Sequence, residues 1–172
     1  MERCPVSTMH PSDKAAVGVA EKYPLPAIII DLGTATKITV VTEDHSYIGG
    51  AILPGVAISL SALSGSTSLL PSIGLGAGKI KTIGSNTVDC MISGVVLGFA
   101  CMLDGMIERY REELGEVPTV VACGGLASTI VPHCKSDIIL DKDLLLVAKD
   151  DELGRKLQDL DLPVRKRAPR KE

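Results

Sequence analysis

A short, continuous apolar run that ends in an acid, residues 27–31, constrains the fold of this chain more than any other feature. Runs of this length between turn residues are typical of a central strand that is covered on both faces. A turn at residues 32–35 leads into residues 36–41, where β-branched residues alternate as in a second strand. Another turn, at residues 43–46, precedes a third strand at residues 47–53. The sequence therefore predicts a β-meander near the start of the domain.

Two helices are expected after the meander. The first follows the turn at Gly55 and is expected to reach about Leu69, where a glycine-rich loop begins. Ser85 or Asn86 can cap a second, long helix that runs through Gly115, because both side chains accept hydrogen bonds from free backbone N–H groups.

Three glycines, Gly94, Gly98 and Gly105, lie inside this long helix. Each weakens a helix by about 1 kcal/mol relative to alanine, so we expect the close approach of a neighbouring element, in this chain or in a second subunit, to compensate. Acids, a serine and glycines interrupt the apolar stretch of residues 88–106, which predicts a buried helix rather than a membrane span.

The remaining elements flank this part of the chain. Strands are predicted at residues 119–123 and 137–140, with a short helix between them. Residues 1–13 contain two prolines and no periodicity and should be irregular, whereas residues 14–22 favour a short helix. The order after residue 22, βββ-α-α-β-α-β, indicates an α/β domain.

The composition agrees with one α/β domain and argues against several classes of protein. A chain of 172 residues, 45% of them hydrophobic but only 2% aromatic, can bury an aliphatic core beneath helices. The net charge of −3 gives no global attraction to nucleic acid. Residues 165–171 form a basic run, which is either a solvated end or a contact for nucleic acid or anionic lipid, and residues 150–162 favour an amphipathic helix before it.

Five cysteines are scattered along the chain without a C-x-x-C pair, and the three histidines are far apart in sequence. This pattern is typical of reduced, mostly buried thiols in a cytoplasmic protein and does not predict a zinc site. The first residues contain no apolar signal-peptide core, which also favours a cytoplasmic location.

The chemistry of the chain is expected at the turn between the first two strands, D-L-G-T-A-T at residues 31–36. Gly33 lets the backbone turn tightly and approach an anion, and Thr34 and Thr36 offer hydroxyl and N–H groups to phosphate oxygens. Asp31, at the strand end, can hold a cation that neutralises the phosphates. The alternative is an ordinary β-hairpin with a hydrogen bond between aspartate and threonine.

A glycine pair, Gly124 and Gly125, follows the strand at residues 119–123. The pair fits a strand-to-helix turn at which the backbone meets the base or ribose of a nucleotide, or else a tight turn without a ligand. Its place after a second buried strand favours phosphate binding at the hairpin over an ordinary turn.

Several motifs in order resemble those of type III pantothenate kinases over residues 23–146. The first three are the family's second phosphate motif, a G-G-x-I-x-P-G segment, and an A-L-x-x-x-T-A-x-L-P segment in which serine replaces the second alanine. The others are parts of the long dimerisation helices and the turn that holds adenosine. In that order, they are residues 23–36, 49–55, 62–71, 83–87 with 104–106, and 124–127.

The resemblance implies an α/β, ribonuclease H-like fold of the actin-like ATPase superfamily, which includes sugar kinases and Hsp70, with this chain as the C-terminal half of a two-domain kinase. It implies transfer of the γ-phosphate of ATP to pantothenate, the first step of coenzyme A synthesis. The family works as a homodimer with Mg²⁺ and a monovalent cation, K⁺ or NH₄⁺. By position, Asp31 matches the cation-binding acid and Thr34 an ATP contact, which Gly33 and the glycine pair would complete. Thr67 matches a pantothenate contact made across the dimer interface.

The sequence also departs from the family pattern. The family's first domain carries a D-x-G-N-T phosphate hairpin, which does not occur in this chain. The family's catalytic base belongs to a G-x-D-R motif, whose counterpart here is P-S-D-K at residues 11–14. Asp13 is therefore the candidate base, and Lys14 a candidate substrate-binding residue.

These features predict three parts: residues 1–22 as the remnant of an upstream domain, residues 23–146 as the C-terminal kinase domain, and residues 147–172 as a divergent charged tail. Because half of the ATP site would be missing, we expect a pantothenate kinase that is impaired unless a separate chain supplies the N-terminal half. The alternative is a non-catalytic fragment or a regulatory module similar to Bvg accessory factor. A different sugar or acetate kinase is disfavoured by the segment around Thr67.

Overall fold

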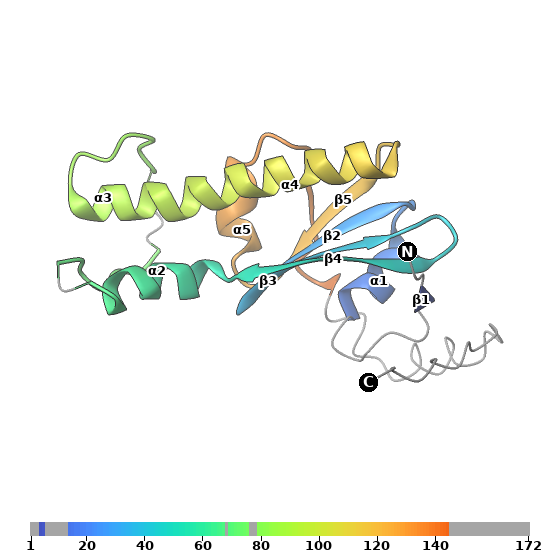
Figure 1. Cartoon of the computed structure of the whole chain (residues 1–172), viewed down its shortest axis with the longest axis horizontal. Coiled ribbons are helices and arrows are strands. Elements are labelled where there is room, and N and C mark those ends of the chain that lie inside the picture. The colour runs from blue at the N-terminus through green and yellow to red at the C-terminus, as the bar shows by residue number, and fades with distance from the viewer. Residues whose placement is uncertain (1–3, 6–13, 68, 76–78, 145–172) are drawn as a thin grey trace, which may run out of the picture.

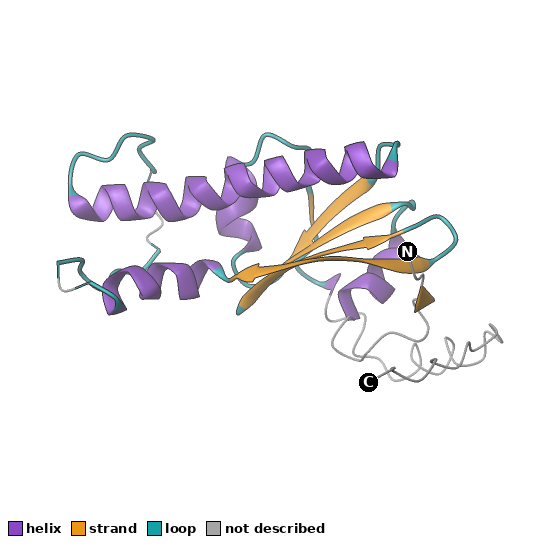
Figure 2. Cartoon of the chain, viewed as in Figure 1, coloured by secondary structure: helices purple, strands orange, loops and turns teal. Residues whose placement is uncertain are grey.

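The computed structural model describes residues 4–5, 14–67, 69–75 and 79–144. Its strands are β1 (Cys4–Pro5), β2 (Ala27–Leu32), β3 (Ala35–Val41), β4 (Ser46–Pro54), β5 (Thr119–Cys123) and β6 (Ile139–Leu140). They form one mixed six-stranded sheet in the order β1-β4-β3-β2-β5-β6. Figures 1 and 2 show its larger strands, β2 to β5, beside the helices. β2, β3 and β4 are an antiparallel meander, and β5 and β6 continue the sheet from β2 in parallel.

The helices are α1 (Lys14–Lys22), α2 (Val56–Gly65), α3 (Thr87–Ile92), a π-helical segment (Ser93–Leu97), α4 (Gly98–Leu114), α5 (Ala127–Ile130) and a 3₁₀ turn (Val131–His133). α3, the π-helical segment and α4 form one continuous helix, which we call the long helix. α2 contacts the long helix, and the two extend together beyond the sheet as an arm (Figure 1).

Alternation along β2 sends its side chains into two separate cores. Ile28 and Ile30 are buried in the larger core, which α2, the long helix and α5 cover. Ala27 and Ile29 are buried in the smaller core, against α1 and the buried Leu144. The predicted central strand with two covered faces is therefore confirmed.

The predicted order of elements after residue 22 and the helix at residues 14–22 are confirmed, but three boundaries differ. Residues 4–5 form β1, which pairs with the edge of β4, so the prediction that all of residues 1–13 are irregular is wrong. The helix predicted to reach Leu69 ends at Gly65, because glycine weakens a helix and the hydroxyl of Thr67 bonds the Leu63 carbonyl at 2.9 Å. The last strand is shorter than predicted, since only Ile139 and Leu140 pair with β5.

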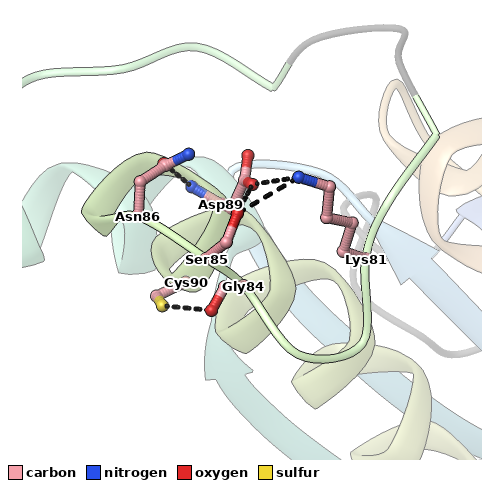
Figure 3. A network of polar contacts seen from close by, with 6 residues as sticks. All are labelled: Lys81, Gly84, Ser85, Asn86, Asp89 and Cys90. Atoms are coloured by element: carbon pink, nitrogen blue, oxygen red, sulfur yellow. Dashed lines mark hydrogen bonds and ion pairs between the residues drawn. The ribbon is translucent and has the colours of Figure 1, made fainter.

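The long helix starts in a network of polar contacts (Figure 3). Asn86 is the N-cap, and its side-chain oxygen accepts from the N–H of Asp89 at 2.9 Å. The carboxylate of Asp89 accepts in turn from Lys81 Nζ at 2.8 Å and from the Ser85 hydroxyl at 3.2 Å. At the other end, Gly115 adopts a left-handed conformation with φ of 71° and closes the helix. The predicted start and end of this helix are confirmed, whereas no sequence signal predicted its π-helical segment.

Much of the apolar surface of the long helix is left uncovered by the described residues. By length and composition alone the helix, Thr87–Leu114, could cross a membrane: an 18-residue window has a mean hydropathy of 1.9, and 33% of that window is buried. The described residues of one chain therefore do not supply the burial that the sequence predicts for most of this window. Within the described chain, nothing lies within 4 Å of the position that a Cβ would take at Gly94, Gly98 or Gly105. The close approach that these glycines predict is not supplied by this part of the chain.

Candidate active site

The carboxyl ends of β2, β4, β5 and β6 lie at one edge of the sheet. β2, β5 and β6 run parallel, and β4 shares their direction because β2 and β4 both pair antiparallel with β3. The segments that leave these strands are the hairpin at residues 33–34, Gly55, Gly124 and Asp141. In open α/β sheets ligands bind outside the carboxyl ends of the strands, so this edge is the candidate site.

Three of these segments touch through backbone atoms, and we call the hairpin at residues 33–34, Gly55 and Gly124 the glycine corner. A Cβ on Gly55 would lie 1.9 Å from the carbonyl oxygen of Thr34. A Cβ on Gly124 would lie 2.6 Å from the carbonyl carbon of Leu32, and its φ of +99° is rare for L side chains. Glycine is therefore required at both positions for the three segments to meet.

Two other glycines at this edge are not required by the chain itself. A Cβ on Gly33 would make only an ordinary contact, 3.4 Å from Asp31 Oδ1, and among the described residues nothing lies within 4 Å of the Cβ position on Gly125. Thr34, next to Gly33, is exposed. The edge therefore leaves room for a ligand against Gly33, Thr34 and Gly125.

Asp31 is a half-buried carboxylate near the end of β2 that accepts no hydrogen bond from the described residues. Burial raises its pKa, and the charge of Lys37, its neighbour on β3, opposes this increase. The described residues contain no group of three or more His, Cys, Asp or Glu side chains that could hold a metal ion. A cation at Asp31 would therefore need oxygen atoms from a ligand or from water.

Asp31 makes no hydrogen bond to a threonine among the described residues. The hairpin is therefore not the ordinary one, with an aspartate–threonine hydrogen bond, that the sequence left as the alternative. Thr36 points into the larger core opposite Leu32 and is fully buried. Its hydroxyl has no partner in the described chain. The expectation that the Thr36 hydroxyl faces a phosphate is therefore wrong, and Thr34 is the available threonine.

Sequence reasoning missed a second acid at the same edge, Asp141, which directly follows β6. Its Oδ2 accepts from Lys22 Nζ at 2.6 Å and from the Tyr23 hydroxyl at 2.8 Å. Burial alone would raise the Asp141 pKa, but these bonds outweigh burial and lower it. Between the two acids, burial and the charges of Asp31 and Asp141 raise the pKa of Cys123 to about 12. The signal that could have found Asp141 is the one that found Asp31, an acid at the end of an apolar strand.

The other predicted site residues lie elsewhere. Thr67 is exposed just beyond the C-terminal end of α2, whereas the glycine corner meets the N-terminal end of this helix. Ten helical residues, about 15 Å, separate these two ends. Lys14 is the first residue of α1, and Asp13 lies outside the described residues. Within this chain the structure thus brings together the predicted cation and ATP contacts, but not Thr67.

A hollow of about 290 Å³ lies over β3 and β4. Its lining includes Lys37, Thr39, Tyr47 and the exposed Ile52. Lys37 also faces Asp31 across the β2–β3 pair, so the hollow adjoins the edge that carries the acid.

Comparison with known proteins assigns this architecture to a family. The model that describes type III pantothenate kinase matches residues 14–109. The chain belongs to the type III pantothenate kinase family.

Curated type III pantothenate kinases match over a longer part of the chain. The enzyme of Acholeplasma laidlawii is 45% identical over 123 residues, which are 72% of this chain and 49% of that protein. The enzymes of Thermus thermophilus and Syntrophus aciditrophicus are 42% and 40% identical, over 76% of this chain and 52% and 51% of theirs. The chain thus spans about half the length of the curated pantothenate kinases that it matches.

Solved structures agree on the fold. A Campylobacter jejuni protein assigned to the Baf family of transcriptional activators superposes with a TM-score of 0.61 at 17% identity, over 93% of this chain and 70% of that one. The Alp12 filament structure superposes with a TM-score of 0.56 at 15% identity, over 86% of this chain and 52% of that one. At these identities the likeness concerns the fold alone, and it confirms the expected actin-like α/β fold.

Proposed function

We propose that the glycine corner and Asp31 form one half of the ATP site of a pantothenate kinase. The observation that supports this proposal is the half-buried Asp31 carboxylate, which has no hydrogen bond among the described residues and lies beside backbone that only glycine allows. Buried carboxylates are normally paired, so one without a partner at a ligand-binding edge is suited to a cation that accompanies phosphate.

Each part of this edge has a role in the proposal. Backbone N–H groups of the hairpin and the exposed hydroxyl of Thr34 would bind phosphate oxygens. Asp31 would bind the cation, Mg²⁺ or a monovalent K⁺ or NH₄⁺, that neutralises the phosphates. The open side of the turn at Gly124 and Gly125 would accept the adenosine. Catalysis would then consist of positioning and charge neutralisation around the transferred phosphoryl group.

Pantothenate would bind beside this half-site. Lys14 and, as general base, Asp13 are assigned to the acceptor by family resemblance, and the hollow next to Lys37 offers space of suitable size. Thr67 would act in a second copy of the chain, because in its own chain it lies a helix length away from the glycine corner. The exposed glycines of the long helix would then lie in the homodimer interface.

Residues 23–146 would be the kinase domain, residues 1–22 a remnant of the preceding domain and residues 147–172 a divergent tail, in a cytoplasmic protein. One hairpin holds only one side of the triphosphate, and orientation contributes about 7–11 kcal/mol to such catalysis. Loss of a general base costs about 10²–10⁴ in rate, so activity would also require Asp13 to reach the acceptor. We therefore propose little turnover by this chain alone and activity once a separate N-terminal half is supplied.

Calorimetric titration with a non-hydrolysable ATP analogue and Mg²⁺ tests the proposed half-site. The wild-type chain should bind the analogue, and Asp31→Asn should weaken binding at least tenfold because it removes the charge that holds the cation. Asp89→Asn is the matched control, since it changes an aspartate on the arm and should leave the affinity unchanged. Equal affinities of wild type and Asp31→Asn would refute the site.

Light scattering tests the proposed dimer. The chain should be a dimer, and Gly98→Leu should give a folded monomer, because no described residue of the same chain lies within 4 Å of that Cβ position. A wild-type monomer would exclude this interface. Nucleotide binding that gives no phosphopantothenate even with the N-terminal half supplied would favour the alternative, a non-catalytic or regulatory module.

A further inference from the structure

Asp141 is the last of three titratable residues that lie side by side at the carboxyl edge of the sheet. Its N–H donates to the carbonyl of Ala122 at 2.9 Å, which continues the β5–β6 pairing by one residue. Asp31 is the register partner of Cys123 on the other side of β5. Asp31, Cys123 and Asp141 therefore follow one another across three neighbouring strand ends.

The side-chain oxygens of Asp141 are fully engaged within the chain. Oδ2 accepts from Lys22 Nζ at 2.6 Å and from the Tyr23 hydroxyl at 2.8 Å, and Oδ1 accepts from the N–H of Asp143 at 3.0 Å. The side chain is only 6% exposed. Unlike Asp31, this carboxylate is not available to a cation or a substrate, so its role must be exerted through the groups that it binds.

Those groups connect Asp141 to α1. Lys22 is the last residue of α1 and Tyr23 the first residue after it. α1 also contacts the same segment at its middle: a Cβ on Gly18 would lie 3.1 Å from Leu144 Cδ1 and 3.3 Å from its carbonyl oxygen. Residues 141–144 therefore contact α1 at its middle and hold its end by hydrogen bonds.

α1 covers the face of the sheet on which Asp31 lies. Ala27 and Ile29 pack against α1 in the smaller core, and alternation along β2 places Asp31 on the same face. Cys123, next to Asp31, belongs to this core as well. The placement of α1 thus determines which residues of this helix can reach the Asp31 edge.

We propose that Asp141 is a positioning residue, which through Lys22 and Tyr23 fixes α1 beside the Asp31 edge and so places the acceptor-binding start of this helix. The proposal rests on the proposed function, in which Lys14 contacts pantothenate. Asp141 touches no substrate in this role. It is expected to affect the acceptor and not the nucleotide, because α1 is not part of the glycine corner.

Two readouts on the complete 172-residue chain test this role. In Asp141→Asn, amide hydrogen exchange in residues 15–22 should become at least tenfold faster, while exchange in β2 and β5 stays unchanged. Pantothenate affinity, measured by calorimetry with saturating ATP analogue, should fall about tenfold, with the affinity for the analogue itself unchanged. Lys22→Met should reproduce both effects, and Lys22→Arg should largely preserve the wild-type values.

Asp104→Asn is the matched control. Asp104 also binds a distant segment, by accepting from the N–H groups of Lys135 and Ser136, but it lies on the long helix in the other layer. Its variant should leave exchange in α1 and pantothenate affinity unchanged.

Three results would overturn the positioning role. The first is unchanged exchange in α1, or an increase no larger than in Asp104→Asn. The second is faster exchange in α1 with unchanged pantothenate affinity. The third is a wild-type chain that binds no pantothenate. This result would remove pantothenate from the proposed function, and the positioning role with it. Binding of the ATP analogue would still test the nucleotide half-site separately.

Discussion

Asp31 at the edge of the sheet and Asp89 at the start of the long helix are both aspartates close to a turn, but their surroundings are opposite. Asp89 accepts hydrogen bonds from Lys81 and Ser85, and these contacts lower its pKa. Asp31 accepts none from the described residues, and burial raises its pKa.

The difference separates a group that stabilises the fold from one that is available to a ligand. The bonds around Asp89 build the first turn of the long helix (Figure 3). At the edge, Asp31 has no hydrogen-bond partner among the described residues, although Gly55 and Gly124 let three backbone segments meet at the end of the same strand. Groups left unsatisfied against local stability are expected at functional sites, because selection for ligand binding retains them.

The largest expected effect concerns the glycine corner. Gly124→Ala should lower the free energy of unfolding by roughly 2–4 kcal/mol, because its Cβ would overlap backbone of Leu32 in a left-handed conformation. Gly125→Ala is the control on the adjacent residue and should change it by about 0.5 kcal/mol or less. Urea unfolding of both variants measures the difference, and equal stabilities would contradict the backbone contact that defines the corner.

A smaller loss is expected at the arm. Asn86→Ala removes the side-chain oxygen that caps the long helix and should lower stability by about 1 kcal/mol. Thermal unfolding should show this loss, and ATP-analogue affinity should be unchanged because the cap belongs to the structural region. A loss of nucleotide affinity would show that the two regions are not independent.

The two aspartates should respond to pH with opposite signs. Asp31 has a raised pKa, so its contribution to stability is fully present below pH 3.8, the ordinary aspartate pKa. This contribution is lost as the pH rises through the raised value. Asp31→Asn should therefore stabilise the chain at pH 7, by about 0.5 kcal/mol or more. Asp89 has a lowered pKa, so its contribution is present above 3.8 and is lost as the pH falls through the lowered value.

Asp89→Asn should accordingly destabilise the chain at pH 7. Melting curves of both variants from pH 3 to pH 8 provide the test. If both substitutions shift the melting temperature in the same direction at pH 7, the contrast between the two regions is not electrostatic.

The smallest effect involves no change in stability. The pKa of Cys123 is raised to about 12, so at pH 8 this buried thiol should resist iodoacetamide. In the monomeric Gly98→Leu variant, Cys90 and Cys101 are exposed on the long helix and should be alkylated first. Peptide mass spectrometry over time gives the order, and early labelling of Cys123 would mean that the edge is open to solvent.

The parts of the structure that the sequence predicted are those with local causes. The apolar run before Asp31 and the caps Asn86 and Gly115 each act within a few residues, and each is where the sequence places it. The parts that were missed depend on distant partners. β1 exists because β4 offers an edge, and Asp141 acquires its role from Lys22, which is 119 positions away in the sequence.

The covering of the long helix could not be predicted for a different physical reason. Hydropathy predicts that residues such as those around Gly98 avoid water, but it does not say which surface covers them. Within the described chain that surface is absent, so the sequence predicts the apolar helix correctly but does not say what covers it. The predicted phosphate contact of the Thr36 hydroxyl was wrong for a similar reason, because a hairpin motif does not specify which threonine points into the core.

β2 and β5 are neighbours in the sheet although the whole arm, residues 56–114, lies between them in the chain. The meander can form once residue 54 has left the ribosome, since its pairings are local. Gly124 can reach Leu32 only after the arm has been completed and has closed a long loop, which is slow. We therefore expect the hairpin at residues 33–34 to form early in folding and the glycine corner to form among the last features, after the arm has packed onto the sheet.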